Sequence, residues 1–163
     1  MLSSFVERVF SGVSGDVRGC VGYSETEMSA IARLYDISVT GQLSDFLSVM
    51  GRSDGGWLGD SIIQLYRPAW RVREHLLFQE VFLADLRECG GKKYLNRPFV
   101  FSFISDSQYY FVQSGLGDQV FHYDSNEESV CSLSYDLRGF LNCLLMQLSG
   151  ERSLATSGDL LKI

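Results

Sequence analysis

Two histidines are the first candidates for acid–base chemistry in this sequence. His122 and Asp124 stand two residues apart, so on a strand they would project from the same face, where a carboxylate can orient a histidine as a base. The pattern places no serine or cysteine beside them as a nucleophile. A surface histidine next to a carboxylate is therefore the simpler interpretation. His75, next to Glu74 on a predicted helix, is interpreted as a helix-surface or core histidine.

The cysteines give little support for a metal site. None of them forms a C-x-x-C pair, and in a reducing compartment free thiols are expected, several of them buried as small apolar side chains. A zinc site would need these thiols together with His75 and His122, and their spacing matches no usual ligand pattern. We expect no metal and no cofactor. The cysteines are Cys20, Cys89, Cys131 and Cys143.

Two short motifs resemble catalytic or nucleotide-binding sequences. The run from Gly59 to Ile62 reads GDSI, like the opening of a GDS-type esterase, but that motif needs a late Asp-x-x-His and no histidine follows His122. The glycines of the 115–117 segment lack the third glycine and the following helix of a dinucleotide loop, which indicates a turn. We therefore expect a protein that is not an enzyme.

The most unusual feature is the absence of lysine and arginine between Arg97 and Arg138. One interpretation is a set of solvated loop ends with a helix cap at Asp136. The other is an anionic surface that fits a cationic protein partner, such as the phosphate-binding groove of a nuclease. The carboxylates are Asp106, Asp118, Asp124, Glu127, Glu128 and Asp136, of which the first five are the candidate binding residues.

Aromatic residues supply further candidate contacts with a partner. Trp57 lies in a glycine-flanked loop, where an aromatic side chain can anchor a partner. Tyr109 and Tyr123 lie on predicted strands, and we include them as candidate surface anchors. Trp70, near the start of a predicted long helix, is interpreted as a core residue.

Hydrophobic periodicity predicts an α+β fold. Helices are expected over 2–10, over the segment after a Ser24–Glu27 capping box, over a third segment ending at a left-handed Gly51, over 69–89 after Pro68, and over 136–148. A short strand is expected over 62–66. Period-two alternation over 99–124 predicts a three-stranded antiparallel meander, with a possible fourth strand at 129–133. We expect helices to cover one face of this antiparallel β-sheet.

Length and charge limit the remaining possibilities. The 163 residues suit one domain, with its core at about 20–148 and a tail at 150–163 that docks through Leu160, Leu161 and Ile163. The start lacks the pattern of a secretory signal, and no window approaches a membrane helix, so we expect a cytoplasmic protein. The net charge of −6 disfavours nucleic acid as a partner. We expect a monomer or weak dimer, with no membrane partner.

Three segments resemble the SUKH superfamily, the Smi/Knr-like proteins. YSETEMSAIARLYDISVTGQLSDFLSVMG is similar to its opening helix–break–helix, PFVFSFISDSQYYFVQSGLGDQVFHYDSN to its meander, and YDLRGFLNCLL to its closing helix. The break at Ile37–Gly41 lacks the usual Leu-Pro, and 61–91 fits loosely. The matching positions are Ser24, Ile31, Tyr35, Ile37, Phe46, Leu47, Gly51, Val120, Phe121, Tyr123, Phe140 and Leu141.

The resemblance implies a function in protein binding. Most bacterial members look like immunity proteins that neutralise polymorphic toxins, many of them nucleases, and fungal members are cell-wall regulators that act through protein partners. We therefore expect an immunity protein that blocks a basic toxin domain by occlusion. The alternative is a regulatory or scaffold module of the same fold that binds a host protein. An enzyme ranks third, and would require a pocket with a nucleophile in reach of His122.

Overall fold

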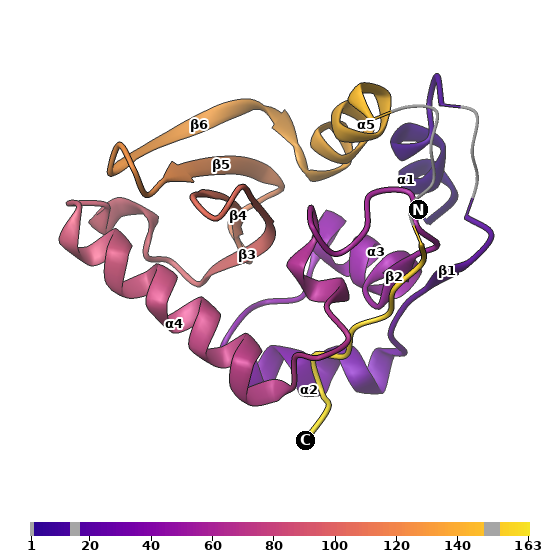
Figure 1. The fold of residues 1–163 in the computed structure, drawn as a ribbon, viewed down its shortest axis with the longest axis horizontal. Coiled ribbons are helices and arrows are strands. Elements are labelled where there is room, and N and C mark those ends of the chain that lie inside the picture. The colour runs from indigo at the N-terminus through magenta and orange to yellow at the C-terminus, as the bar shows by residue number, and fades with distance from the viewer. Residues whose placement is uncertain (1, 14–16, 149–153) are drawn as a thin grey trace.

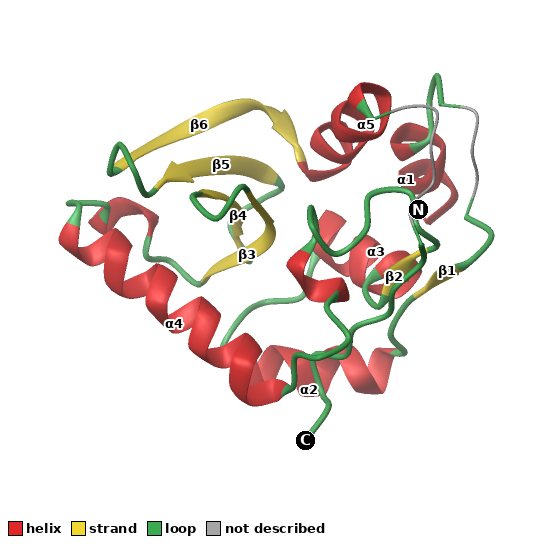
Figure 2. Cartoon of the chain, in the orientation of Figure 1, coloured by secondary structure: helices red, strands yellow, loops and turns green. Residues whose placement is uncertain are grey.

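Five α-helices and two antiparallel sheets form an α+β fold within residues 2–13, 17–148 and 154–163, which the computed structural model describes (Figures 1 and 2). The helices are α1 (Leu2–Val9), α2 (Glu25–Tyr35), α3 (Gly41–Met50), α4 (Val72–Glu88) and α5 (Leu137–Gln147), with short 3₁₀ turns η1 (Gln64–Tyr66) and η2 (Lys92–Tyr94). The strands are β1 (Cys20–Val21), β2 (Ser53–Asp54), β3 (Pro98–Ile104), β4 (Gln108–Gln113), β5 (Gln119–Asp124) and β6 (Ser129–Asp136). The predicted class is confirmed.

Two helices begin where local sequence signals place them. The Ser24 hydroxyl accepts from the Glu27 amide at 3.2 Å, and the Glu27 carboxylate accepts from the Ser24 amide at 2.9 Å, which completes the predicted capping box of α2. Asp136 caps α5, because its carboxylate accepts from the Gly139 amide at 2.9 Å. Both starts depend on residues within three positions of each other, so the sequence alone reveals them.

Three local predictions are wrong. Residues 64–66 form the turn η1 with all three side chains buried, rather than an alternating strand. Helix α4 begins at Val72, four residues after Pro68. Gly51 has a right-handed φ of −67°, so it does not end α3 in the left-handed region. Glycine is required here for steric reasons, because a Cβ at this position would lie 2.6 Å from the Leu47 carbonyl oxygen and 2.7 Å from the Tyr23 ring.

The large sheet is a meander of order β3-β4-β5-β6, and its fourth strand runs past the predicted residue 133 to Asp136. Helices cover both faces, rather than the one face expected from the sequence. The first face packs against α1, α3 and α5 and carries Phe99, Phe101, Val112 and Val120. The second face lies against α4 (Figure 1), whose Phe82 and Leu86 contact a cluster formed by Val100, Tyr109, Phe111 and Tyr123.

A buried carboxylate shapes the loop after α3. Asp54 is 3% exposed, and its two oxygens accept from the backbone amides of residues 56–59 at 2.7–3.4 Å. These amides would otherwise lack partners in the interior, so the carboxylate stabilises the loop conformation. The same strand pairs with β1 through the Cys20–Asp54 register. The loop is therefore a fixed part of the core.

The C-terminal segment is built into the core. The Leu160 amide donates to the Tyr23 hydroxyl at 2.8 Å, and the Tyr35 hydroxyl donates to the Leu160 carbonyl at 2.7 Å. Leu160 is fully buried and Leu161 half-buried, as predicted, whereas Ile163 is 99% exposed and does not dock. The predicted tail at 150–153 lies outside the described residues. Docking therefore occurs through two of the three predicted side chains.

Within the described parts of the chain, every helix is too short or too polar to cross a membrane.

Candidate protein-binding surface

Two turns of the meander meet at the end of the sheet away from α5 (Figure 1). They are the β3–β4 turn over 105–107 and the β5–β6 turn over 125–128. The Ser125 amide donates to the Ser107 carbonyl at 2.9 Å, and its hydroxyl contacts the same oxygen at 3.3 Å, so the turns are held together. This region, called here the acidic end, carries Asp106, Asp124, Glu127 and Glu128.

Most carboxylates of the acidic end face solvent without a cation. Asp106, Glu127 and Glu128 are exposed, and none of the three forms an ion pair among the residues that the structure describes. Asp124 is half-buried and shapes its own turn by accepting from the Asn126 amide at 2.9 Å. A hydrogen bond from the Gln108 side chain is the main cause that lowers the pKa of Asp124. The charge of the acidic end is therefore available to a partner.

The backbone at the acidic end is strained where two of the acids stand. Ser105, Asp106 and Glu128 have φ values of 55°, 59° and 50°, in the left-handed region that favours glycine. A glutamate there costs about 1 kcal/mol relative to its ordinary conformations. Backbone strain of this kind is concentrated at functional sites. Here a carboxylate occupies a position that glycine would adopt with less strain.

Asp118 does not belong to the acidic end. It lies in the β4–β5 turn, at the opposite end of the sheet, and its carboxylate accepts from the Gln42 amide at 2.9 Å. Gln42 also donates to the Asp136 carboxylate at 3.0 Å and accepts from the Arg138 amide at 2.9 Å. Asp118 is therefore part of a hydrogen-bond network that joins α3, the sheet and α5, at a distance from the other four predicted acids, and its contact with a partner stays a prediction.

The three predicted aromatic anchors are not free on the surface. Tyr109 and Tyr123 are 8% and 2% exposed, because α4 covers the face of the sheet on which they lie. Burial is the main cause that raises the pKa of Tyr123 to about 12, and Asp85 of α4 adds to it. Trp57 is half-buried, and its ring centroid lies 6.1 Å from that of Phe10 in an edge-to-face arrangement. All three support the fold.

An apolar groove along α4 supplies an aromatic surface that the sequence did not predict. It has a volume of about 280 Å³ and is lined by Trp70, Glu74, Leu77, Phe78 and Val81. Leu77 is 62% exposed and Val81 48% exposed. Trp70 is half-buried at the surface rather than in the core, and the Arg67 guanidinium lies 4.6 Å from its ring centroid. The unusually wide apolar face of the 69–89 segment was the signal in the sequence.

The groove and the acidic end adjoin each other through a chain of rings. Phe78 lies 5.1 Å from Phe103, centroid to centroid, and Phe103 lies 4.7 Å from Tyr109. Phe103 stands three residues before Asp106 on the same hairpin. Asp85 and Asp106 both help to raise the pKa of Tyr109, after the larger effect of burial, which places both acids near this ring. These contacts place the groove next to the acidic end.

His122 has a potential nucleophile beside it, contrary to the sequence pattern. Cys131 is its register partner on β6, and the Cys131 sulfur lies 4.0 Å from His122 Nδ1. Burial lowers the pKa of His122, and Asp124 partly opposes this. Cys131 is exposed, so the pair lies on an open part of the sheet. No group of three potential metal ligands occurs among the described residues.

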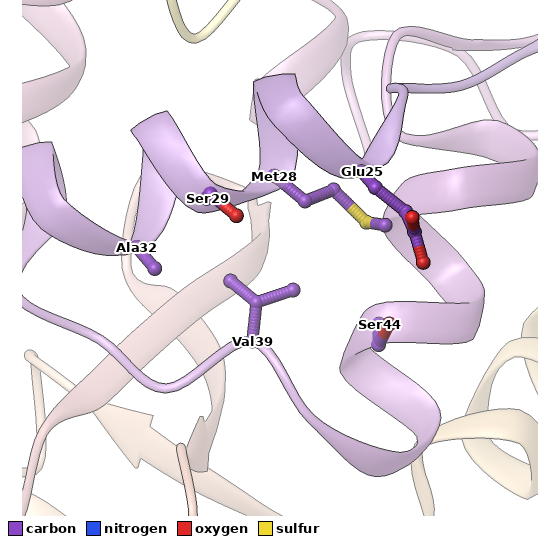
Figure 3. A pocket seen from close by; sticks show the side chains of 6 residues that line it. All are labelled: Glu25, Met28, Ser29, Ala32, Val39 and Ser44. Atoms are coloured by element: carbon purple, nitrogen blue, oxygen red, sulfur yellow. The ribbon is translucent and has the colours of Figure 1, made fainter.

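A second hollow lies between α2 and the start of α3 (Figure 3). Its volume is about 330 Å³, and its walls carry Met28, Ala32 and Val39 together with two serine hydroxyls and Glu25. In Figure 3 the Val39 side chain points toward α2, and the Met28 side chain runs from α2 toward Glu25. The hollow contains no pair of groups suited to acid–base or nucleophilic chemistry, so it does not suggest an active site.

No protein family, curated protein or solved structure gives a significant match to this chain.

Proposed function

We propose that this chain is a cytoplasmic immunity protein of the SUKH type, which binds a cognate toxin domain and blocks it by occlusion, without catalysis. The resemblance in sequence suggests the class, and one structural observation supports the mode of binding. At the acidic end, Asp106, Glu127 and Glu128 are exposed and free of ion pairs among the described residues, and two of them stand at left-handed positions.

The chemistry of this surface favours a basic partner. Exposed carboxylates attract a cationic groove over long range and raise the rate of association. The adjoining groove offers Trp70, Leu77 and Val81 as an apolar contact, and interfaces commonly combine such an aromatic centre with a charged rim. A toxin domain that holds phosphate, such as a nuclease, has the required positive charge. Nucleic acid itself and anionic membranes would be repelled.

The test first asks whether a gene beside this one encodes a large secreted protein whose C-terminal domain is toxic when expressed. We expect co-expression of the full chain to restore growth, and the purified pair to form a complex. The double variant Glu127→Lys and Glu128→Lys should weaken the complex about tenfold or more, mainly through slower association, and should flatten its salt dependence.

A matched control changes the same amount of charge elsewhere. Glu7 and Glu25 are exposed on α1 and α2, so Glu7→Lys with Glu25→Lys alters the net charge equally. Equal weakening by both double variants would show that only net charge matters and would overturn the assigned surface. Failure to restore growth, with co-purification of a housekeeping protein instead, would favour the alternative of a regulatory or scaffold module.

A further inference from the structure

A row of hydrogen-bonded side chains leads from Asp124 to Cys131 over strands β4, β5 and β6. Gln108 pairs with Asp124 and Tyr110 with His122 across β4 and β5, and His122 pairs with Cys131 across β5 and β6. The His122 ring stacks on Tyr110 at 4.8 Å between centroids, with 20° between the ring planes. The Tyr110 ring centroid in turn lies 4.7 Å from that of Phe140 on α5, so one face of the imidazole packs against a ring that is itself held in place.

The hydrogen bonds of Gln108 determine which nitrogen of His122 carries the proton. The amide nitrogen of Gln108 donates to the Ser107 hydroxyl at 2.9 Å, and the Gln108 side chain also donates to the Asp124 carboxylate. These bonds use the amide hydrogens, so the amide oxygen turns to His122 Nε2 and accepts from it. Nδ1 therefore keeps its lone pair, and this nitrogen faces the Cys131 thiol at 4.0 Å.

We propose that Cys131 is a reactive thiol, activated by His122, that forms mixed disulfides with low-molecular-weight disulfides such as oxidised glutathione. Cys131 is exposed on the edge strand of the sheet, where such a co-reactant can approach. A thiolate is the attacking species in this exchange, and a neighbouring histidine increases its population. The imidazole can accept the thiol proton at Nδ1, because its hydrogen bond to Gln108 is made by Nε2.

The exchange balances without a further oxidant or reductant. His122 Nδ1 takes the thiol proton of Cys131, and the resulting thiolate attacks one sulfur of the disulfide. A new sulfur–sulfur bond forms while the old one breaks, and the leaving thiolate takes the proton from His122. Cys131 ends as a mixed disulfide, and the other half of the co-reactant ends as a free thiol. Disulfide exchange at Cys131 requires only these side chains and is independent of toxin binding.

The experiment measures mixed-disulfide formation at each cysteine of the full chain at pH 7, with oxidised glutathione as the probe and peptide mass as the readout. Cys143 is an internal reference, because its sulfur contacts the Tyr135 hydroxyl at 3.7 Å and no described histidine. We expect Cys131 to react about tenfold faster than Cys143, and about tenfold faster than Cys131 in urea-unfolded chain.

Two variants separate activation from exposure. His122→Asn should lower the rate at Cys131 to within about twofold of the unfolded chain and leave Cys143 unchanged. Gln108→Leu removes the acceptor that orients His122 and should lower the rate at Cys131 severalfold, so it serves as the second test if His122→Asn fails to fold. An unchanged rate at Cys131 in either folded variant, or a wild-type rate no faster than that of the unfolded chain, would overturn the proposal.

Discussion

The two ends of the four-stranded sheet use carboxylates in opposite ways. At the end next to α3 and α5, Asp118 and Asp136 accept hydrogen bonds from helix starts and from Gln42. At the acidic end, Glu127 and Glu128 have no such partners among the described residues and are exposed. A carboxylate that accepts backbone amides stabilises the fold, whereas one that faces solvent contributes little to it. The carboxylates at one end of the sheet therefore stabilise the fold, whereas those at the acidic end are available to a partner.

The largest expected effect on stability comes from Asp136, at the end of the sheet next to α3 and α5. Its carboxylate caps α5 through Gly139, accepts from Gln42 and lies 3.6 Å from the Arg138 guanidinium. Asp136→Ala removes these interactions together, and we expect a loss of about 2 kcal/mol in the free energy of unfolding. Chemical denaturation measures this loss.

A conservative variant at the same position provides the control. Asparagine is also a good N-cap, so Asp136→Asn should retain the Gly139 bond and lose about half as much stability as the alanine variant. If Asp136→Ala unfolds at the same denaturant concentration as the wild type, the structural role assigned to this end of the sheet is wrong.

Asp118 should have a smaller but clear effect. Thr40 occupies the N-cap position of α3 but makes no side-chain cap bond, and Asp118 accepts from the Gln42 amide in its place. We expect Asp118→Ala to cost about 1 kcal/mol and Thr40→Ala to change stability by less than about 0.5 kcal/mol. Thermal unfolding of both variants checks this, and an equal loss in the two would contradict a cap supplied from the sheet.

The role of Asp118 also shows where prediction from the sequence stops. The capping box of α2 and the cap at Asp136 were predictable, because donor and acceptor are three residues apart. Asp118 and Gln42 are 76 residues apart, and nothing local links them. Composition shows that the 98–137 segment is acidic, but only tertiary contacts show which acids are already used.

The buried tyrosines illustrate a second limit. Strand alternation correctly groups Tyr109 with Phe111 on one face of β4. It does not show that α4 returns across this face, so the tyrosines appeared available to a partner. The pairing of His122 with Cys131 is easier to predict from the sequence, because it follows from the register of the β5–β6 hairpin once β6 is recognised as a full strand.

Acid titration should separate the two ends further. Burial acts to raise the pKa of Asp136, but the donors Gln42 and Gly139 and the nearby Arg138 outweigh it, so the pKa is lowered. A lowered carboxyl pKa means that the native state binds the proton less readily than the unfolded state. Its contribution to stability is present above the unfolded pKa of about 3.9 and is lost as the pH falls through the native pKa.

The measurement is the stability difference between the wild type and each of Asp136→Asn and Asp124→Asn as the pH is lowered from 6. The pKa of Asp124 is also lowered, chiefly by the Gln108 hydrogen bond, but Asp124 is at the more open end. We expect added salt to diminish the pH-dependent difference for Asp124 more than for Asp136. A greater effect of salt on Asp136 would contradict the division between the two ends.

The smallest expected effect tests whether strain at the acidic end is kept for binding. Glu128 has a φ of 50°, so Glu128→Gly relieves a left-handed conformation, although glycine also adds flexibility to the unfolded chain. We expect a net gain of about 0.5 kcal/mol in stability. Glu127 is not among the positive-φ residues, so Glu127→Gly removes the same charge without relief and should lose about 0.5 kcal/mol.

Both variants remove one negative charge from the acidic end, so both should weaken binding to the toxin domain to a similar degree. Opposite changes in stability with similar losses in affinity would mean that the strained carboxylate is retained for the partner at the expense of the fold. If Glu128→Gly binds as tightly as the wild type, that carboxylate is not part of the interface, and the strain at this turn has no bearing on recognition.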